Sequence, residues 1–191
     1  LDEAESLALF AEYGVPVMAH RIVESGDAAE AAARELGFPA VLKTAMPGIL
    51  HKSDVGGVKL DLRDIAAVRA AYDDLAHRLG PRVLVMTMAG KGTELAFGAL
   101  DDPQFGPIVM AGAGGVLIEI MGDRKFALPP FDRATGRRLI DRLKSRPLLD
   151  GKRGMAAADR ESVAEAFAKF SVMAADLAGL FAEIDVNPVL C

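Results

Sequence analysis

The chain has 191 residues, of which 51% are hydrophobic and 26% are charged, and its formal net charge is −5. Such a length allows one compact domain or two small lobes of ordinary globular composition. The acidic balance argues against a general nucleic-acid binder, because that binding depends mainly on neutralising phosphates. Cys191 is the single cysteine, so no disulfide can form within the chain. No signal peptide or apolar run of about 20 residues is visible, so we expect a cytoplasmic protein without a membrane span.

Helices and strands are expected to alternate in the first half of the chain. Helical spacing of apolar residues predicts three helices, at residues 3–13, at 27–36 with Asp27 as the cap, and at 64–79. Short apolar runs predict four strands, at residues 20–25, 39–45, 58–62 and 82–88. The segment 46–57 is expected to be a loop, since it contains proline and paired glycines. This alternation predicts a small α/β lobe that ends in a hinge at residues 89–93.

The second half of the chain has a different pattern. Three apolar runs separated by turn residues predict an antiparallel sheet, with strands at residues 92–100, 105–112 and 114–122. Helices are expected at residues 131–145 and 159–178, and a last strand at 181–190. The abrupt ends of the chain lead us to expect a fragment of a longer polypeptide.

The segment HKSDVGG, residues 51–57, is the first candidate site. It places His51 in a loop with Lys52, Asp54 and two glycines, rather than on an apolar face. Gly56 and Gly57 would let the backbone approach a bulky anion, and the lysine could offset phosphate charge. Asp54 could hold one imidazole nitrogen so that the other is free to attack. The residues alone leave open whether His51 is a ligand, a general base, a nucleophile or a structural group.

Lys43 and Arg153 are candidate phosphate contacts. Lys43 lies in an otherwise apolar strand, and it either reaches an exposed edge or points a cation into a cleft. Arg153 lies in a loop flanked by glycines, where a guanidinium could clamp a phosphate. The other basic residues of this region are expected to form a solvated helix face.

The segment EIDVNP, residues 183–188, is a candidate magnesium site. Asp185 and Asn187 alternate with apolar residues, so in a strand they point to one face. Oxygen ligands on one face suit magnesium, but a polar outer face of an edge strand would look the same. Glu119 is also a notable carboxylate, because it lies in a strongly apolar run after the glycine-rich turn AGAGG.

These motifs together resemble one family along essentially all 191 residues. The chain resembles the ATP-grasp domain, of the β-subunit type, of the NDP-forming acyl-CoA synthetases, such as ADP-forming acetate–CoA ligase. HKSDVGGV, DPQFGP and EIDVNP carry the resemblance most specifically, supported by the segments GVPV, ELGFPAVLKTA and PLLDGKRG.

The resemblance implies an α/β (α+β) ATP-grasp fold that binds nucleotide between two lobes, residues 1–89 and 90–191, the second truncated at its C-terminal end. It implies that acyl-CoA, ADP and phosphate give the acid, CoA and ATP through phosphohistidine, with His51 as carrier. A CoA-binding and ligase domain, or α subunit, would handle acyl-CoA, and we expect the full enzyme to be an oligomer. The implied sites comprise nucleotide contacts at Lys43, Met88, Glu94 and Arg153, a phosphate loop with Lys52, Gly56 and Gly57, and magnesium ligands at Asp185, Asn187 and Glu119.

Two alternatives remain open on this fold. One is a carboxylate–amine ligase, which would need no phosphohistidine. The other is an ATP-binding regulatory module without catalysis, because Thr87 and Ala127 stand where the family usually has an acid or amide and an arginine.

Overall fold

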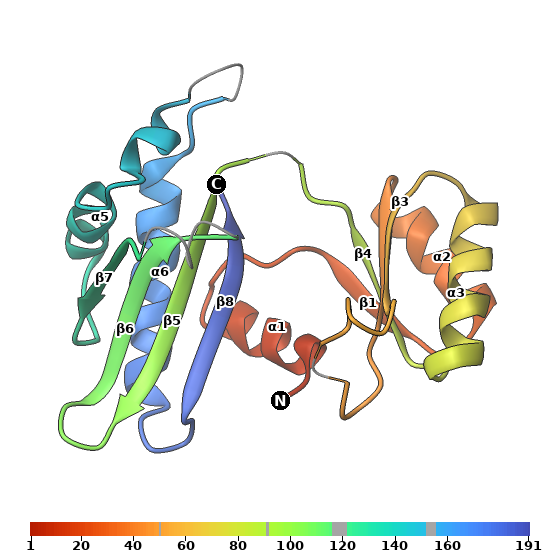
Figure 1. Ribbon diagram of the computed structural model, residues 1–191, viewed down its shortest axis with the longest axis horizontal. Helices are drawn as coiled ribbons and strands as arrows, with labels where there is room; N and C mark the ends of the chain where they lie inside the picture. The colour runs from red at the N-terminus through yellow and green to blue at the C-terminus, as the bar shows by residue number, and fades with distance from the viewer. Residues whose placement is uncertain (50, 91, 116–121, 152–155) are drawn as a thin grey trace. The chain divides into compact units, whose positions relative to one another are not determined.

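The computed structural model describes residues 1–49, 51–90, 92–115, 122–151 and 156–191. The chain divides into two compact units, each with its own sheet (Figure 1). The first unit comprises residues 1–9 and 17–90, and the second comprises residues 10–16 and 91–191. No helix in the described part of the chain is long and apolar enough to cross a membrane.

The first unit is a four-stranded sheet with two helices on one face, and Ala4 and Leu7 of the chain's first helix packed on the other. Its elements in chain order are β1 (His20–Val23), α2 (Gly26–Leu36), β2 (Ala40–Thr44), β3 (Val58–Leu62), α3 (Ile65–Leu79) and β4 (Val83–Thr87). The strand order is β1-β4-β2-β3, and every neighbouring pair is antiparallel. Since β1 and β2 both pair antiparallel with β4, they run in the same direction, and α2 joins them across that central strand. The first helix, α1 (Glu3–Glu12), precedes β1.

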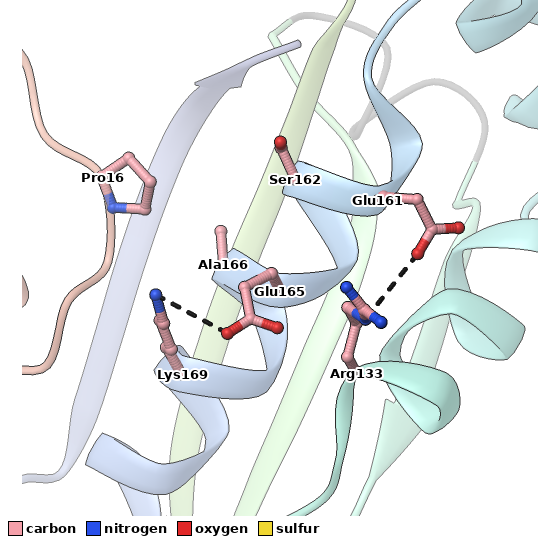
Figure 2. A pocket seen from close by; sticks show the side chains of 7 residues that line it. All are labelled: Pro16, Arg133, Glu161, Ser162, Glu165, Ala166 and Lys169. Carbon is pink, nitrogen blue, oxygen red and sulfur yellow. Dashed lines mark ion pairs between the residues drawn. The ribbon is translucent and has the colours of Figure 1, made fainter.

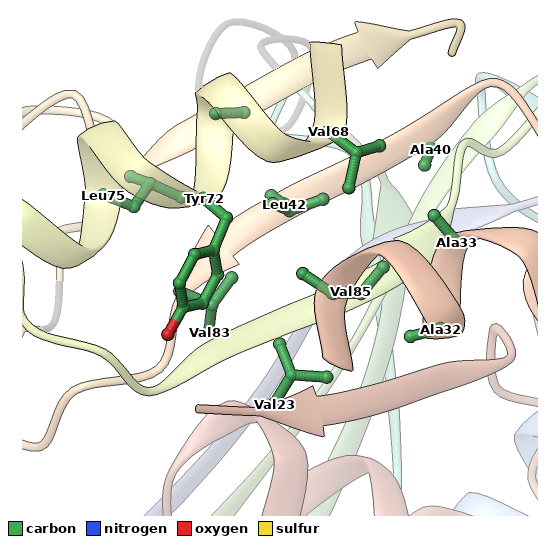
Figure 3. Packing of buried hydrophobic residues seen from close by; sticks show 12 residues of the cluster. Val23, Ala32, Ala33, Ala40, Leu42, Val68, Tyr72, Leu75, Val83 and Val85 are labelled. Carbon is green, nitrogen blue, oxygen red and sulfur yellow. The ribbon is translucent and has the colours of Figure 1, made fainter. Parts of the chain in front are cut away.

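The core of the first unit lies between the sheet and the helices α2 and α3 (Figure 3). Val68, Tyr72 and Leu75 follow one another at helical spacing on α3 and are buried against Leu42 and Val85 of the sheet. The Tyr72 hydroxyl, which would be costly to bury alone, donates to the Pro81 carbonyl oxygen at 3.0 Å. This packing sets the position of β2 and of the loop that leaves it.

The second unit has another antiparallel sheet, in the order β7-β6-β5-β8. Its elements are β5 (Glu94–Asp102), β6 (Gly106–Ala113), β7 (Arg124–Ala127), α5 (Arg133–Asp141), the 3₁₀ helix η1 (Arg146–Asp150), α6 (Arg160–Asp176) and β8 (Glu183–Leu190). Phe97 of β5 contacts Phe167 and Phe170 of α6, with ring centroids 4.7 and 5.8 Å apart. In β8, Ile184 and Val186 are partly buried, whereas Glu183, Asp185 and Asn187 are exposed. The alternation therefore leaves the polar side chains on the face opposite α6.

The fold class predicted from the sequence is confirmed, and the differences are local. Ser25, not Asp27, caps α2: its hydroxyl oxygen accepts the Ala28 N–H at 3.2 Å, and Asp27 lies within the first turn. Most of the strand expected at 114–122 lies outside the described residues, and the strand that pairs with β6 is β7. The helix expected at 131–145 ends at Asp141, and η1 was not predicted.

Candidate functional site

His51 is an exposed residue of the loop that joins β2 to β3. The loop closes on itself at its C-terminal end, where the Gly57 N–H donates to the Lys52 carbonyl oxygen at 2.7 Å. The Gly57 carbonyl oxygen in turn accepts the Thr44 N–H of β2 at 2.8 Å. Within the described residues, no hydrogen bond joins the imidazole to the Asp54 carboxylate, and Asp54 instead donates its N–H to the His51 carbonyl oxygen. His51 thus lies at the surface of the unit, with no hydrogen bond of its ring among the described contacts.

The two glycines of this loop have local structural reasons to be glycine. Gly56 has a φ of +62°, in the left-handed region that side chains disfavour. A β-carbon on Gly57 would lie 2.7 Å from the Thr44 methyl group and 2.9 Å from the Lys52 carbonyl oxygen. Arg78 of α3 also holds this end of the loop, since its guanidinium donates to the carbonyl oxygens of Val55 and Gly56 at 3.1 and 3.0 Å. Close approach of a phosphate to these glycines stays a prediction.

Lys43 and Lys52 share one carboxylate. The Lys43 ammonium donates to one Glu3 oxygen at 2.6 Å, and the Lys52 ammonium pairs with the other. Burial on its own would raise the pKa of the Glu3 carboxyl, but the two ammonium groups outweigh it and lower that pKa below its ordinary value. Two predicted phosphate contacts therefore lie together in the first unit, and one of them, Lys52, is the chain neighbour of His51.

Met88, the predicted adenine neighbour, follows β4 directly. Its N–H donates to the Pro39 carbonyl oxygen at 2.9 Å, and its side chain packs against a small apolar cluster that includes Val41 and Met86. This arrangement fixes the backbone after β4. The role in adenine binding stays a prediction.

In the second unit, the glycine-rich turn brings Glu94 and Asn187 together. The Gly115 N–H donates to the Asn187 side-chain oxygen at 2.9 Å, and the Gly114 N–H donates to the Glu94 carbonyl oxygen at 2.9 Å. A β-carbon on Gly115, whose φ is +57°, would lie 2.2 Å from a carboxylate oxygen of Glu94. The turn therefore depends on glycine at position 115, and it orients one predicted metal ligand beside one predicted nucleotide contact.

The predicted magnesium ligands Asp185 and Asn187 both lie on the exposed face of β8. Burial, with a smaller contribution from the neighbouring Glu183 charge, raises the pKa of the Asp185 carboxyl. No ion pair to Asp185 occurs within the described residues, and no three acidic, histidine or cysteine side chains there form a cluster that could hold a metal. Magnesium often uses only one or two carboxylates with substrate phosphates, so these oxygen donors fit that ion. Glu119 and Arg153 lie outside the described residues.

A shallow depression of about 300 Å³ on the second unit contains none of the predicted residues (Figure 2). Its charged side chains pair with each other, Arg133 with Glu161 at 3.8 Å and Lys169 with Glu165 at 3.6 Å. With these charges satisfied internally, the depression offers no group aimed at a ligand.

Three site residues were missed in the sequence: Glu3, Arg78 and Gly115. Glu3 reads as an ordinary acid in the first turn of a helix, and nothing local links it to lysines 40 and 49 positions away. Gly115 does carry a signal, because paired glycines between two apolar runs indicate a tight turn.

Comparison with known proteins places these features in one family. Residues 1–191 match the family described as ATP-grasp domain. The β subunit of ADP-forming acetate–CoA ligase I from Pyrococcus furiosus is 33% identical over 99% of this chain and 84% of that subunit. ADP-forming acetate–CoA ligase I from Archaeoglobus fulgidus is 36% identical over 97% of this chain, which spans only 28% of that longer protein.

A solved structure agrees. The dinucleotide-forming acetyl-coenzyme A synthetase 1 of Ca. Korarchaeum cryptofilum, with coenzyme A, Mg-AMPPCP and its phosphohistidine segment pointing towards the nucleotide binding site, has a TM-score of 0.85. It is 38% identical, and the match covers 100% of this chain and 84% of that one. The resemblance seen in the sequence is confirmed: this chain belongs to the ATP-grasp family and is a homologue of the ATP-grasp subunits and domains of ADP-forming acyl-CoA ligases.

Proposed function

We propose that this chain is the phosphoryl-transferring domain of an ADP-forming acyl-CoA synthetase, an acid–thiol ligase, and that His51 carries the phosphoryl group. The observation that carries the proposal is the exposed imidazole beside Lys52, whose ammonium lies with that of Lys43. The overall reaction converts acyl-CoA, ADP and phosphate into the acid, CoA and ATP. The proposed lobes are residues 1–89 and 90–191; the compact units of the structure differ from them in residues 10–16, which belong to the second unit, and in residue 90, which belongs to the first.

The step assigned to His51 is a transfer between the imidazole and a nucleotide. In the direction of ATP synthesis, a terminal oxygen of ADP attacks the phosphorus on His51. The new P–O bond forms as the N–P bond breaks, and the imidazole nitrogen keeps the electron pair. Such a transfer needs positioning and charge neutralisation more than covalent help from other side chains. Lys43 and Lys52 would supply the charge neutralisation. Met88 and Arg153 complete the proposed nucleotide contacts.

The second unit supplies oxygen ligands and the glycine-rich turn. Asp185 and Asn187, with Glu119, would hold magnesium, and the ion would neutralise charge on the nucleotide phosphates. The raised pKa of Asp185 supports this role, since an anion that is destabilised by burial and by Glu183 gains from a nearby cation. Glu94, held next to Gly115, would contact the nucleotide.

The phosphoryl group would come from an acyl phosphate, which a CoA-binding partner would form from acyl-CoA and phosphate with release of CoA; its transfer to histidine would release the acid. The Pyrococcus relative is a β subunit, whereas the Archaeoglobus relative is more than three times as long as the matched region. The partner is therefore proposed as either an α subunit or a fused domain. It would bind acyl-CoA, and an oligomer would bring both parts together.

Phosphorylation with labelled ATP tests the proposal. The full-length protein with its partner is incubated with magnesium and ATP labelled at the γ-phosphate, and acid-labile label is mapped. We expect label on His51 that is absent in His51→Ala and retained in the matched control His77→Ala, an exposed histidine at the end of α3. Normal labelling of the His51→Ala variant would refute the proposal.

Two other outcomes identify the alternatives. ATP-dependent amide formation from an acid and an amine, without label on the protein, would indicate a carboxylate–amine ligase. Nucleotide binding without label or turnover would indicate a regulatory module. Thr87 and Ala127, which differ from the residues usual in the family, are consistent with that alternative.

A further inference from the structure

Glu3 bridges the two lysines to which the proposed function assigns charge neutralisation. Its carboxylate oxygens bind the ammonium groups of Lys43, on β2, and Lys52, on the β2–β3 loop. The side chains of Glu3, Lys43 and Lys52 are 29%, 27% and 16% exposed, so this is a partly buried network rather than a solvated surface pair. Such networks contribute more than isolated exposed ion pairs, whose worth is usually small.

The Glu3 carboxylate allows the two ammonium groups to lie close to each other. Two like charges at such close range repel each other in a partly desolvated setting, and one anion between them removes that cost. Against the effect of burial, the two ammonium groups also hold the pKa of the Glu3 carboxyl below its ordinary value, so Glu3 stays ionised at neutral pH. Without it, Lys52 would be expected to turn towards solvent and away from Lys43.

Lys52 also connects the His51 segment, residues 51–57, to the rest of the first unit through its side chain. The C-terminal end of the loop is fixed by hydrogen bonds. The Arg78 guanidinium donates to the carbonyl oxygens of Val55 and Gly56, and the Gly57 N–H donates to the Lys52 carbonyl oxygen. Among the described contacts, the ion pair with Glu3 is what ties the side chain next to His51 to the body of the first unit. A movement of this segment that carries the Lys52 ammonium away from Lys43 would break the pair between Lys52 and Glu3.

We propose that Glu3 is a positioning residue that holds the His51 segment to the first unit through Lys52, and that the Glu3–Lys52 ion pair opens when the segment leaves. The proposal rests on the proposed function in one respect: His51 would have to move between the partner that supplies the phosphoryl group and the nucleotide that accepts it. The contact itself, and its effect on the loop, stand on the geometry of the first unit.

Hydrogen exchange of the loop amides tests the contact without any nucleotide. In Glu3→Gln, we expect the amides of Asp54, Gly56 and Gly57 to exchange roughly threefold to tenfold faster, because the charged hydrogen bond to Lys52 is lost. Glu35→Gln is the matched control, since it removes an ion pair between α2 and β1 of the same unit. Its loop amides should exchange as in the wild type.

A double variant separates positioning from a general structural effect. If Glu3 acts through Lys52, Glu3→Gln should cause no further acceleration in a Lys52→Met background. An acceleration that persists in that background, or unchanged loop exchange in Glu3→Gln itself, overturns the proposal. Failure of His51 to accept label would refute the proposed function and leave this exchange result intact, so the two failures are distinguishable.

Discussion

Gly57→Ala is the sharpest test of how the His51 loop closes. The added β-carbon would lie 2.7 Å from the Thr44 methyl group, 2.9 Å from the Lys52 carbonyl oxygen and 3.3 Å from a Leu79 methyl group. Thr44 is fully buried, so its side chain has little room to rotate, and the Lys52 oxygen belongs to the backbone. The loop must therefore shift, and the bond from the Gly57 N–H to Lys52 must weaken.

The magnitude follows from two opposing effects. Overpacking a close-packed site costs about 1–3 kcal/mol, and the lower chain entropy of alanine in the unfolded state returns about 0.4–1 kcal/mol. We expect a net loss of roughly 1–2 kcal/mol in the free energy of unfolding. For a chain of this size, each kcal/mol lowers the melting temperature by about 2–4 °C. Urea and thermal unfolding followed by circular dichroism would measure both.

Gly90→Ala is the matched control, because a β-carbon there would meet nothing within 4 Å and the residue has no positive φ. It should be neutral or slightly stabilising. If Gly57→Ala unfolds like Gly90→Ala, the steric explanation of Gly57 is wrong.

Three further predictions concern the second unit. Asp185→Asn should raise stability at pH 7 by no more than about 0.5 kcal/mol, because a carboxyl whose pKa is raised by folding destabilises the fold above that pKa. The same variant should weaken magnesium-dependent labelling of His51, and equal labelling would contradict the proposed role of Asp185 as a magnesium ligand. Asp123→Ala should cost about 2–4 kcal/mol in urea unfolding, since this buried carboxylate accepts two backbone N–H groups at 2.9 and 2.7 Å, and these bonds outweigh burial and lower its pKa. The stability that this group gives the wild type is fully present above the ordinary carboxyl pKa and is lost as pH falls from there through the lowered pKa, so a pH-independent difference between the two proteins below pH 7 would refute this. Gly115→Ala should displace the Glu94 side chain and reduce nucleotide affinity in a titration. Alanine at the left-handed φ of +57° should lower the free energy of unfolding by only about 1–2 kcal/mol, and unchanged affinity would show that Glu94 does not contact the nucleotide.

Local patterns in the sequence were enough to predict most of the elements. The apolar spacing of Val68, Tyr72 and Leu75 identified α3, and the structure buries that stripe. Alternation in EIDVNP predicted a strand with its polar residues on one face, as β8 has. Each signal involves residues within a few positions of one another, whose relative placement a single helix or strand already determines.

Signals at the element ends were less complete. Ser25 and Asp27 are both good helix caps, and the sequence offered no way to choose between them, because the choice depends on which backbone N–H lies free. The antiparallel arrangement of the first sheet was likewise undetermined. The alternation of helices and strands predicts a parallel sheet equally well, and only the insertion of β4 between β1 and β2 decides it.

His51 and its motif were visible in the chain from the start, because a histidine among a lysine, an aspartate and glycines is a local pattern and the family carries it. The partners of that motif were not. Glu3 meets Lys43 and Lys52 across 40 and 49 residues, and Gly115 meets Asn187 across 72. Such pairings follow from which strands neighbour each other and where each loop returns, so only the packed tertiary structure brings these groups within bonding distance.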